Sequence, residues 1–145
     1  MDKTKNISLL AVSFRQGFES PNVPIALFKQ GDKNIVFLLD SGSDKNVIDA
    51  EAVKNFEHSV IQQEEKTTTH LTGVGGTKEV EMCNMSFKSG DETYNCEFLI
   101  TDLKPAFDAI EEAHCIRIHG ILGSSFLKEH NAVLDFKTLS AYSKT

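Results

Sequence analysis

The sequence predicts a mainly β domain, on three observations. Turn-forming residues recur at short intervals, as they do when short strands alternate with tight connections. The 145-residue chain is 40% hydrophobic and contains ten phenylalanines, enough to fill the core of one domain. No internal repeat, low-complexity tract or linker divides it. We therefore expect a single domain over residues 1–145.

Short apolar runs between turn signals mark the expected strands. These strands cover residues 8–14, 23–29, 35–40, 46–48, 93–101, 132–136 and 139–143. A long hairpin is expected over residues 67–87, with glycines at its middle. Helices are expected over residues 49–57, 104–115 and 124–129. Asp49 is the expected N-cap of the first helix, because a side-chain carboxylate there accepts a free backbone amide.

The charge balance argues against a nucleic-acid partner. The chain has 15 Lys and Arg against 21 Asp and Glu, a net charge of −6, and no basic stripe. The apolar patch near the N-terminus is short and interrupted by serines, and nothing approaches the roughly 20 apolar residues of a membrane span. We therefore expect no nucleic-acid partner, no membrane partner and a cytoplasmic location.

Neither the cysteines nor the histidines are spaced like metal ligands. Cys83, Cys96 and Cys115 are odd in number and show no Cys-x-x-Cys spacing, which favours reduced thiols over a disulfide framework or a zinc site. The five histidines show no HExxH or similar spacing. We expect no metal and no cofactor.

The stretch IVFLLDSGSDKNVI, residues 35–48, contains the main functional signal. Its continuous apolar run is typical of a strand covered on both faces, and the run ends on Asp40. A carboxylate at the edge of a core is costly to keep without a partner. Gly42 allows a tight turn and the close approach of another chain. Asp40 is therefore a candidate catalytic acid, although a polar turn capping a strand would also explain it.

Two glycine-containing segments follow downstream. LTGVGGT, residues 71–77, places three glycines at a hairpin tip, either as a surface turn or as a flap whose backbone can bind an extended peptide. GILG, residues 120–123, follows about eighty residues after Asp40 and could be a core strand entering a helix. Each segment is ordinary when taken alone.

Taken together and in this order, the three segments resemble the retropepsin-like aspartic proteases, over about Ile25 to Phe136. The resemblance implies a closed acid-protease β-barrel with a flap hairpin and one to three short helices. It also implies an aspartic endopeptidase that acts on polypeptide substrates.

The resemblance assigns roles to individual residues. Asp40 would be the catalytic aspartate, Ser41 would brace the loop by hydrogen bonding to the partner loop, and Gly42 would permit the turn. Ser43 and Asp44 would contact the substrate, the latter by holding its backbone. The flap tip would consist of Val74, Gly75 and Gly76, and the loop would be supported from beneath by Ile121, Leu122 and Gly123.

The chain contains only half of an aspartic protease site. This chemistry needs two carboxylates that share one proton, and no second Asp-Ser/Thr-Gly is present. The resemblance therefore implies a twofold homodimer in which two Asp40 residues meet. Retroviral members usually continue with Gly-Arg-Asn, the Arg being locked to an acid near the active site, whereas Gly123 is followed here by Ser124 and Ser125. This departure concerns the dimer contacts and the substrate cleft.

Two alternatives stay open at the sequence level. A non-catalytic dimeric domain of the same fold could bind peptides or partner proteins. A structural β-barrel could contain Asp-Ser-Gly only as a turn.

Overall fold

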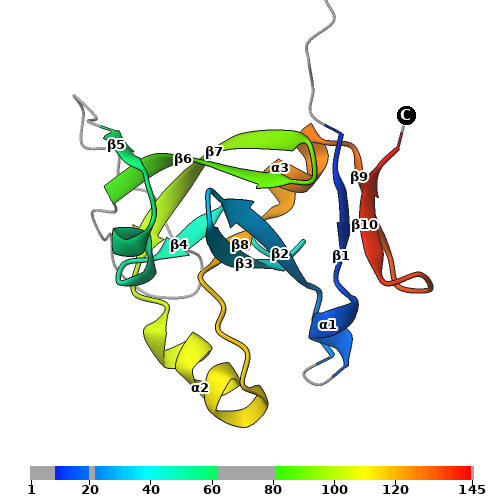
Figure 1. Ribbon diagram of the computed structural model, residues 1–145, viewed down its shortest axis with the longest axis horizontal. Coiled ribbons are helices and arrows are strands. Elements are labelled where there is room, and N and C mark those ends of the chain that lie inside the picture. The colour runs from blue at the N-terminus through cyan, green and yellow to red at the C-terminus, as the bar shows by residue number, and fades with distance from the viewer. Residues whose placement is uncertain (1–8, 20–21, 62–80, 145) are drawn as a thin grey trace, which may run out of the picture.

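The residues that the structure describes form two β-sheets, and the larger one closes into a barrel (Figure 1). The structure, a computed structural model, describes residues 9–19, 22–61 and 81–144. The larger sheet has the strand order β2 (Ile25–Gln30), β3 (Lys33–Leu39), β8 (Gly120–Leu122), β4 (Val47–Asp49), β7 (Glu92–Thr101), β6 (Glu81–Ser89) and β5 (Ser59–Ile61). A further pairing of β2 with β6 closes six of these strands into a barrel. The expected mainly β fold with a closed barrel is confirmed.

The smaller sheet joins the two ends of the described chain. β1 (Ala11–Ser13) pairs antiparallel with β10 (Ser140–Ser143), which pairs in turn with β9 (Ala132–Asp135). In Figure 1 this sheet lies beside the barrel, on the side opposite β5. Val12 and Ala141 face each other in register and are both buried in the main core. The small sheet is therefore packed against the barrel on one face.

Aromatic rings fill the barrel. The Phe37 ring stacks on Phe98 at 5.4 Å between centroids, and Phe28 contacts Phe87 edge to face at 5.0 Å. Tyr94 is also buried, and its hydroxyl donates to the Leu9 carbonyl at 2.9 Å. Burying each such side chain contributes about 1.5–3 kcal/mol. Exposed and buried residues alternate along β6 and β7, which is the period expected of strands with one face on a core.

In the described part of the chain, four short helical segments connect the strands. They are α1 (Arg15–Phe18), the 3-10 helix η1 (Ala52–Asn55), α2 (Lys104–His114) and α3 (Ser124–Glu129). The helices expected over 104–115 and 124–129 are confirmed, whereas α1 occupies a segment that was not expected to be helical. Within the described residues, no helix is both long and apolar enough to cross a membrane. The first half and the tip of the hairpin expected over 67–87 lie outside the described residues, and β6 forms its second half.

Of the helix expected over residues 49–57, only the 3-10 turn η1 forms, although the expected N-cap bond of Asp49 is present. β4 continues through Asp49, whose backbone N–H donates to the His119 carbonyl at 2.9 Å. Ala50 donates to the Thr101 carbonyl, so the backbone stays in the sheet where a helix was expected. Asp49 Oδ2 does accept the Ala52 amide, at 3.2 Å, as an N-cap would, but only the single turn of η1 follows.

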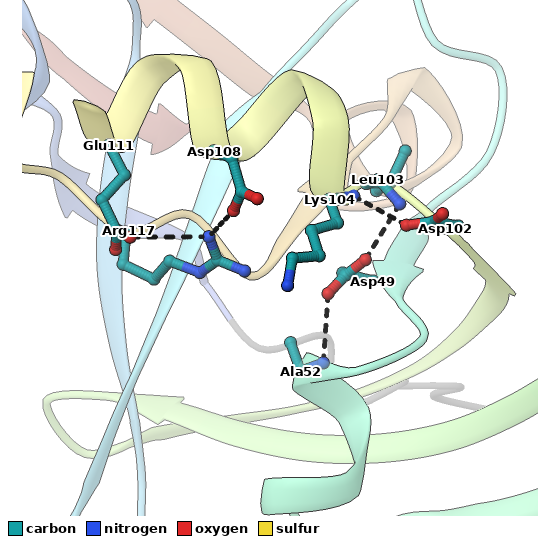
Figure 2. A network of polar contacts seen from close by, with 8 residues as sticks. All are labelled: Asp49, Ala52, Asp102, Leu103, Lys104, Asp108, Glu111 and Arg117. Carbon is teal, nitrogen blue, oxygen red and sulfur yellow. Dashed lines mark hydrogen bonds and ion pairs between the residues drawn. The ribbon is translucent and has the colours of Figure 1, made fainter. Parts of the chain in front are cut away.

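The Asp49 side chain also connects the barrel to α2 (Figure 2). Asp49 is fully buried, and its Oδ1 accepts the Leu103 amide at 2.9 Å, immediately before α2. The other end of the helix is bound by Arg117, whose Nη1 lies 2.6 Å from Asp108 Oδ1 and 3.8 Å from Glu111 Oε1. The Asp49 contact fixes α2 to the end of β4, and the Arg117 contacts fix it to the segment before β8.

His119 lies just before β8 and hydrogen-bonds to both β3 and β4. Its Nδ1 accepts the Val36 N–H at 2.9 Å, and its backbone N–H donates to the Val36 carbonyl at 2.8 Å. Its ring contacts Phe56 edge to face at 5.1 Å between centroids. Burial, and secondly the nearby positive charge of Arg117, lower the pKa of His119 below its ordinary value of 6.5, against the opposing effect of Asp49. The neutral ring is required because a protonated Nδ1 could not accept the Val36 amide.

We predict that Asp49→Ala lowers the free energy of unfolding by about 3 kcal/mol, because the backbone amides of Ala52 and Leu103 lose a charged acceptor inside the fold. Urea denaturation monitored by circular dichroism measures this change. Asp102→Ala is the matched control, since exposed Asp102 accepts the Lys104 amide at 3.0 Å, and its loss should cost about 1 kcal/mol. If both variants lose the same small amount of unfolding free energy, the proposed role of Asp49 is contradicted.

We further predict that His119 makes the fold less stable in acid. Because its folded-state pKa is lowered, the unfolded chain takes up the proton first as the pH falls below about 6.5. His119→Asn keeps an oxygen acceptor for Val36 without titrating. The loss of unfolding free energy between about pH 7.5 and about pH 5.5 should therefore be smaller in this variant than in the wild type. An identical pH dependence in both proteins would contradict this.

Candidate active site

Asp40 lies directly after β3, at a point where three strands meet. β8 runs between β3 and β4, parallel to the first and antiparallel to the second. The parallel pairing ends with Leu39 opposite Leu122, and the Asp40 N–H then donates to the Leu122 carbonyl at 3.0 Å. The buried strand β3 therefore delivers a half-buried carboxylate at its end, as the sequence predicts.

The turn after Asp40 fixes the orientation of its side chain. The Gly42 N–H donates to Asp40 Oδ1 at 2.9 Å, and the Ser43 N–H donates to the Asp40 carbonyl at 3.1 Å. A Cβ placed on Gly42 would lie 3.2 Å from Asp40 Oδ1, so a larger residue would press on the carboxylate. Glycine at this position therefore allows a short contact between the backbone and the acid.

Gly123 brings the segment after β8 into contact with the same loop. A Cβ on Gly123 would lie 2.5 Å from the carbonyl oxygens of both Ser43 and Lys45. This distance is too short for a non-bonded contact, so only glycine fits here. The next amide, that of Ser124, donates to the Ser43 carbonyl at 2.6 Å, and that of Ser125 donates to the Asp44 carbonyl at 3.3 Å. Segment 122–125 therefore supports the Asp40 loop from beneath, as the sequence predicts for its first residues.

The described structure places five of the eight predicted site residues in one loop. Asp40, Gly42 and Ser43 are joined by hydrogen bonds, and the Ser43 hydroxyl donates to the Lys45 carbonyl at 2.8 Å. Ser41 and Asp44 are exposed. The three flap-tip residues, Val74, Gly75 and Gly76, lie outside the described residues. The roles assigned to all eight stay predictions.

Sequence reasoning missed Asn46, which belongs to the same site. It was assigned only to the start of a short strand, yet its side chain is buried, with 8% of its surface exposed, and bonds to the Gly123 amide at 3.0 Å. One signal in the sequence could have indicated this role. The amide side chain of Asn46 directly precedes the apolar pair Val47 and Ile48, and a polar side chain buried beside such a pair needs a hydrogen-bond partner inside the protein.

A cavity of about 320 Å³ opens beside the loop, lined by Lys45 and Asn46 together with residues of β7 and α3. Cys96 is part of its wall, and burial, with a smaller effect of Glu129, raises the pKa of this thiol to about 12. Burial likewise raises the pKa of Cys83 to about 11. These two thiols stay protonated near neutral pH and do not provide a thiolate nucleophile. Among the described residues, no group of three or more His, Cys, Asp or Glu is placed to hold a metal ion.

Comparisons with solved structures show the fold. The chain is similar to the EIAV protease in its complex with the inhibitor HBY-793, with 22% identity, a TM-score of 0.51, and coverage of 79% of this chain and 93% of that one. It is also similar to a retropepsin-like aspartic protease from Rickettsia conorii, with 17% identity, a TM-score of 0.56, and coverage of 92% and 89%. No curated protein matches the chain.

A family model described as aspartyl protease matches residues 23–126, which include β2, the Asp40 loop, β8 and the start of α3. The match covers most of the chain and contains every element that positions Asp40. The chain therefore belongs to the aspartyl protease family and has the retropepsin-like fold.

Proposed function

We propose that the protein is an aspartic endopeptidase that works as a homodimer. The observation that carries this proposal is the placement of Asp40, whose backbone is bonded to Leu122 and whose carboxylate is bonded to the Gly42 amide. A carboxylate held in this way within an aspartyl protease fold is suited to acid–base chemistry, because its orientation is set before a substrate arrives. No second acid in an Asp-Ser/Thr-Gly context is present in the sequence.

In the proposed reaction, two Asp40 carboxyl groups share one proton around a water molecule. The ionised member takes a proton from the water, which attacks the carbonyl carbon of the scissile peptide bond. The protonated member hydrogen-bonds to the carbonyl oxygen as negative charge develops there. The carboxyl that took the proton from water then donates it to the amide nitrogen, and the C–N bond breaks as the tetrahedral intermediate collapses. One shared proton suits this pair, because two like charges a few Å apart repel each other.

The remaining predicted residues have proposed roles around this pair. Ser41, exposed beside Asp40, would hydrogen-bond across to the loop of the second subunit. Ser43 and exposed Asp44 would contact an extended polypeptide substrate. The flap-tip residues would cover the substrate and reduce its contact with water; they are Val74, Gly75 and Gly76.

Other parts of the sequence interpretation also stay predictions. These are the single domain over residues 1–145, the cytoplasmic location, and the absence of nucleic-acid and membrane partners. The alternative function, a non-catalytic dimeric domain that binds peptides or proteins, is distinguished by the experiments that follow.

We predict that Asp40→Asn lowers the rate of peptide cleavage by at least about 10³-fold, because an amide can neither accept nor share the proton. A library of fluorogenic peptides, assayed between acid and neutral pH, measures this change. Asp91→Asn is the matched control, since exposed Asp91 lies in the turn between β6 and β7 and should leave cleavage unchanged. If the wild type and Asp40→Asn bind peptides equally and neither cleaves them, the non-catalytic alternative holds.

We also predict that one mutated half is enough to inactivate the dimer. Two copies of the chain joined by a flexible linker can contain Asp40→Asn in one half only. Because the proton must be shared between both carboxyls, this tandem protein should have less than about 1% of the activity of the unmodified tandem protein. Retention of about half the activity would mean that each chain works alone and would contradict the two-chain site. Analytical ultracentrifugation shows whether each tandem protein is folded and free of higher oligomers.

A further inference from the structure

Asn46 is one of three polar or charged side chains buried among the described residues, with Asp49 and His130. It lies at the end of the Asp40 loop, immediately before β4. A buried amide without partners would be costly, so its hydrogen bonds indicate what the fold uses it for. Within the described residues, no buried side-chain nitrogen or oxygen is left without a partner.

The side chain of Asn46 joins two segments that are distant in sequence. Its Oδ1 accepts the Gly123 N–H at 3.0 Å, and its Nδ2 donates to the Glu97 carbonyl on β7 at 3.1 Å. The Leu99 N–H donates to the Asn46 backbone carbonyl at 2.9 Å, which holds the residue against the same strand. A neutral amide suits this position because it offers an acceptor to one backbone group and a donor to the other.

The bond to Gly123 acts where the Asp40 loop and segment 122–125 are in closest contact. The residues on either side of Gly123 bind the loop through their backbones, Leu122 to Asp40 at 3.0 Å and Ser124 to Ser43 at 2.6 Å. The carbonyl oxygens of Ser43 and Lys45 leave no room for a side chain at Gly123, and a shift of Gly123 away from the loop is opposed by the Asn46 side chain. In the described part of the chain, the other hydrogen bonds between these two segments join backbone atoms, so the Asn46–Gly123 bond is the one that a side-chain substitution removes.

We propose that Asn46 is a positioning residue for the catalytic aspartate. By holding the Gly123 turn against β7, it keeps the Leu122 carbonyl and the Ser124 amide where they orient the Asp40 loop. This inference rests on the proposed function for its effect on catalysis. The effect on the loop itself is a property of the fold and can be measured in the absence of activity.

Two substitutions separate the two hydrogen bonds. Asn46→Ala removes both of them. Asn46→Asp keeps an acceptor for Gly123, but the ionised carboxylate has no proton to donate to the Glu97 carbonyl. When protonated, the introduced carboxyl can make both bonds again. It would share the cavity beside the loop with the charged side chains of Lys45, Glu97 and Glu129, and the net charge of these three does not favour its ionisation.

The activity test measures kcat and KM for each variant relative to the wild type at the same pH. We expect Asn46→Ala to lower kcat by about 10-fold to 100-fold, because a misplaced reacting group reduces the rate more than it reduces substrate binding. For Asn46→Asp, the ratio of its kcat to the wild-type kcat should rise as the pH falls from about 7 to about 5. Asn84→Asp is the control, because exposed Asn84 lies opposite Glu97 in the β6–β7 register and gains the same charge. Wild-type kcat in both Asn46 variants would overturn the proposal, as would the same pH-dependent ratio in the control.

A second measurement does not depend on catalysis. Amide hydrogen exchange at Gly123 and Asp40, followed by NMR, should be at least about 10-fold faster in Asn46→Ala than in the wild type and unchanged in Asn84→Asp. Unchanged exchange in Asn46→Ala would overturn the proposed mechanism. If the wild-type protein cleaves no peptide, the proposed function fails, and the exchange experiment alone decides whether Asn46 holds the loop.

Discussion

The contact between the Asp40 loop and segment 122–125 is the constraint on which the rest of the site depends. Backbone amides and carbonyls of the two segments pair directly, from Asp40 with Leu122 to Asp44 with Ser125. Each bond contributes only about 1 kcal/mol, but Gly123 adds a steric condition, since its Cα hydrogen occupies space that no Cβ could share with two carbonyl oxygens. The two segments lie about eighty residues apart in sequence, and the pairing of β3 with β8 brings them together.

This arrangement explains how the chain departs from the retroviral pattern without losing the loop. Ser124 and Ser125 stand where the retroviral members have an arginine and an asparagine, but both serines bind the loop through backbone amides, for which the side chain is not needed. Arg117, which lies before β8 and not after it, pairs with Asp108 and Glu111 and so fixes α2. The loop is therefore supported by the backbone together with the buried amide of Asn46.

The sequence predicted the parts of the fold that depend on local pattern. The apolar run before Asp40 and the helical spacing in α2 have regular periods, and both elements are confirmed. Over residues 49–57 a helix was expected, but only one 3-10 turn forms, because the backbone of Asp49 and Ala50 is paired with His119 and Thr101, which are distant in sequence. The partners of Asn46 and His119 lie on or beside strands that are distant in sequence, so they depend on the strand pairing and could not be inferred from neighbouring residues.

The central claim is that two copies of Asp40 complete one site. The most direct test is a crystal structure of the purified protein with a peptide-like inhibitor that contains a hydroxyl in place of the scissile bond. We expect a twofold dimer in which one carboxyl oxygen from each Asp40 lies about 3 Å from its mate, with both bonded to that hydroxyl. Copies that assemble with their Asp40 side chains separated by more than about 10 Å, too far for a shared proton, would contradict it.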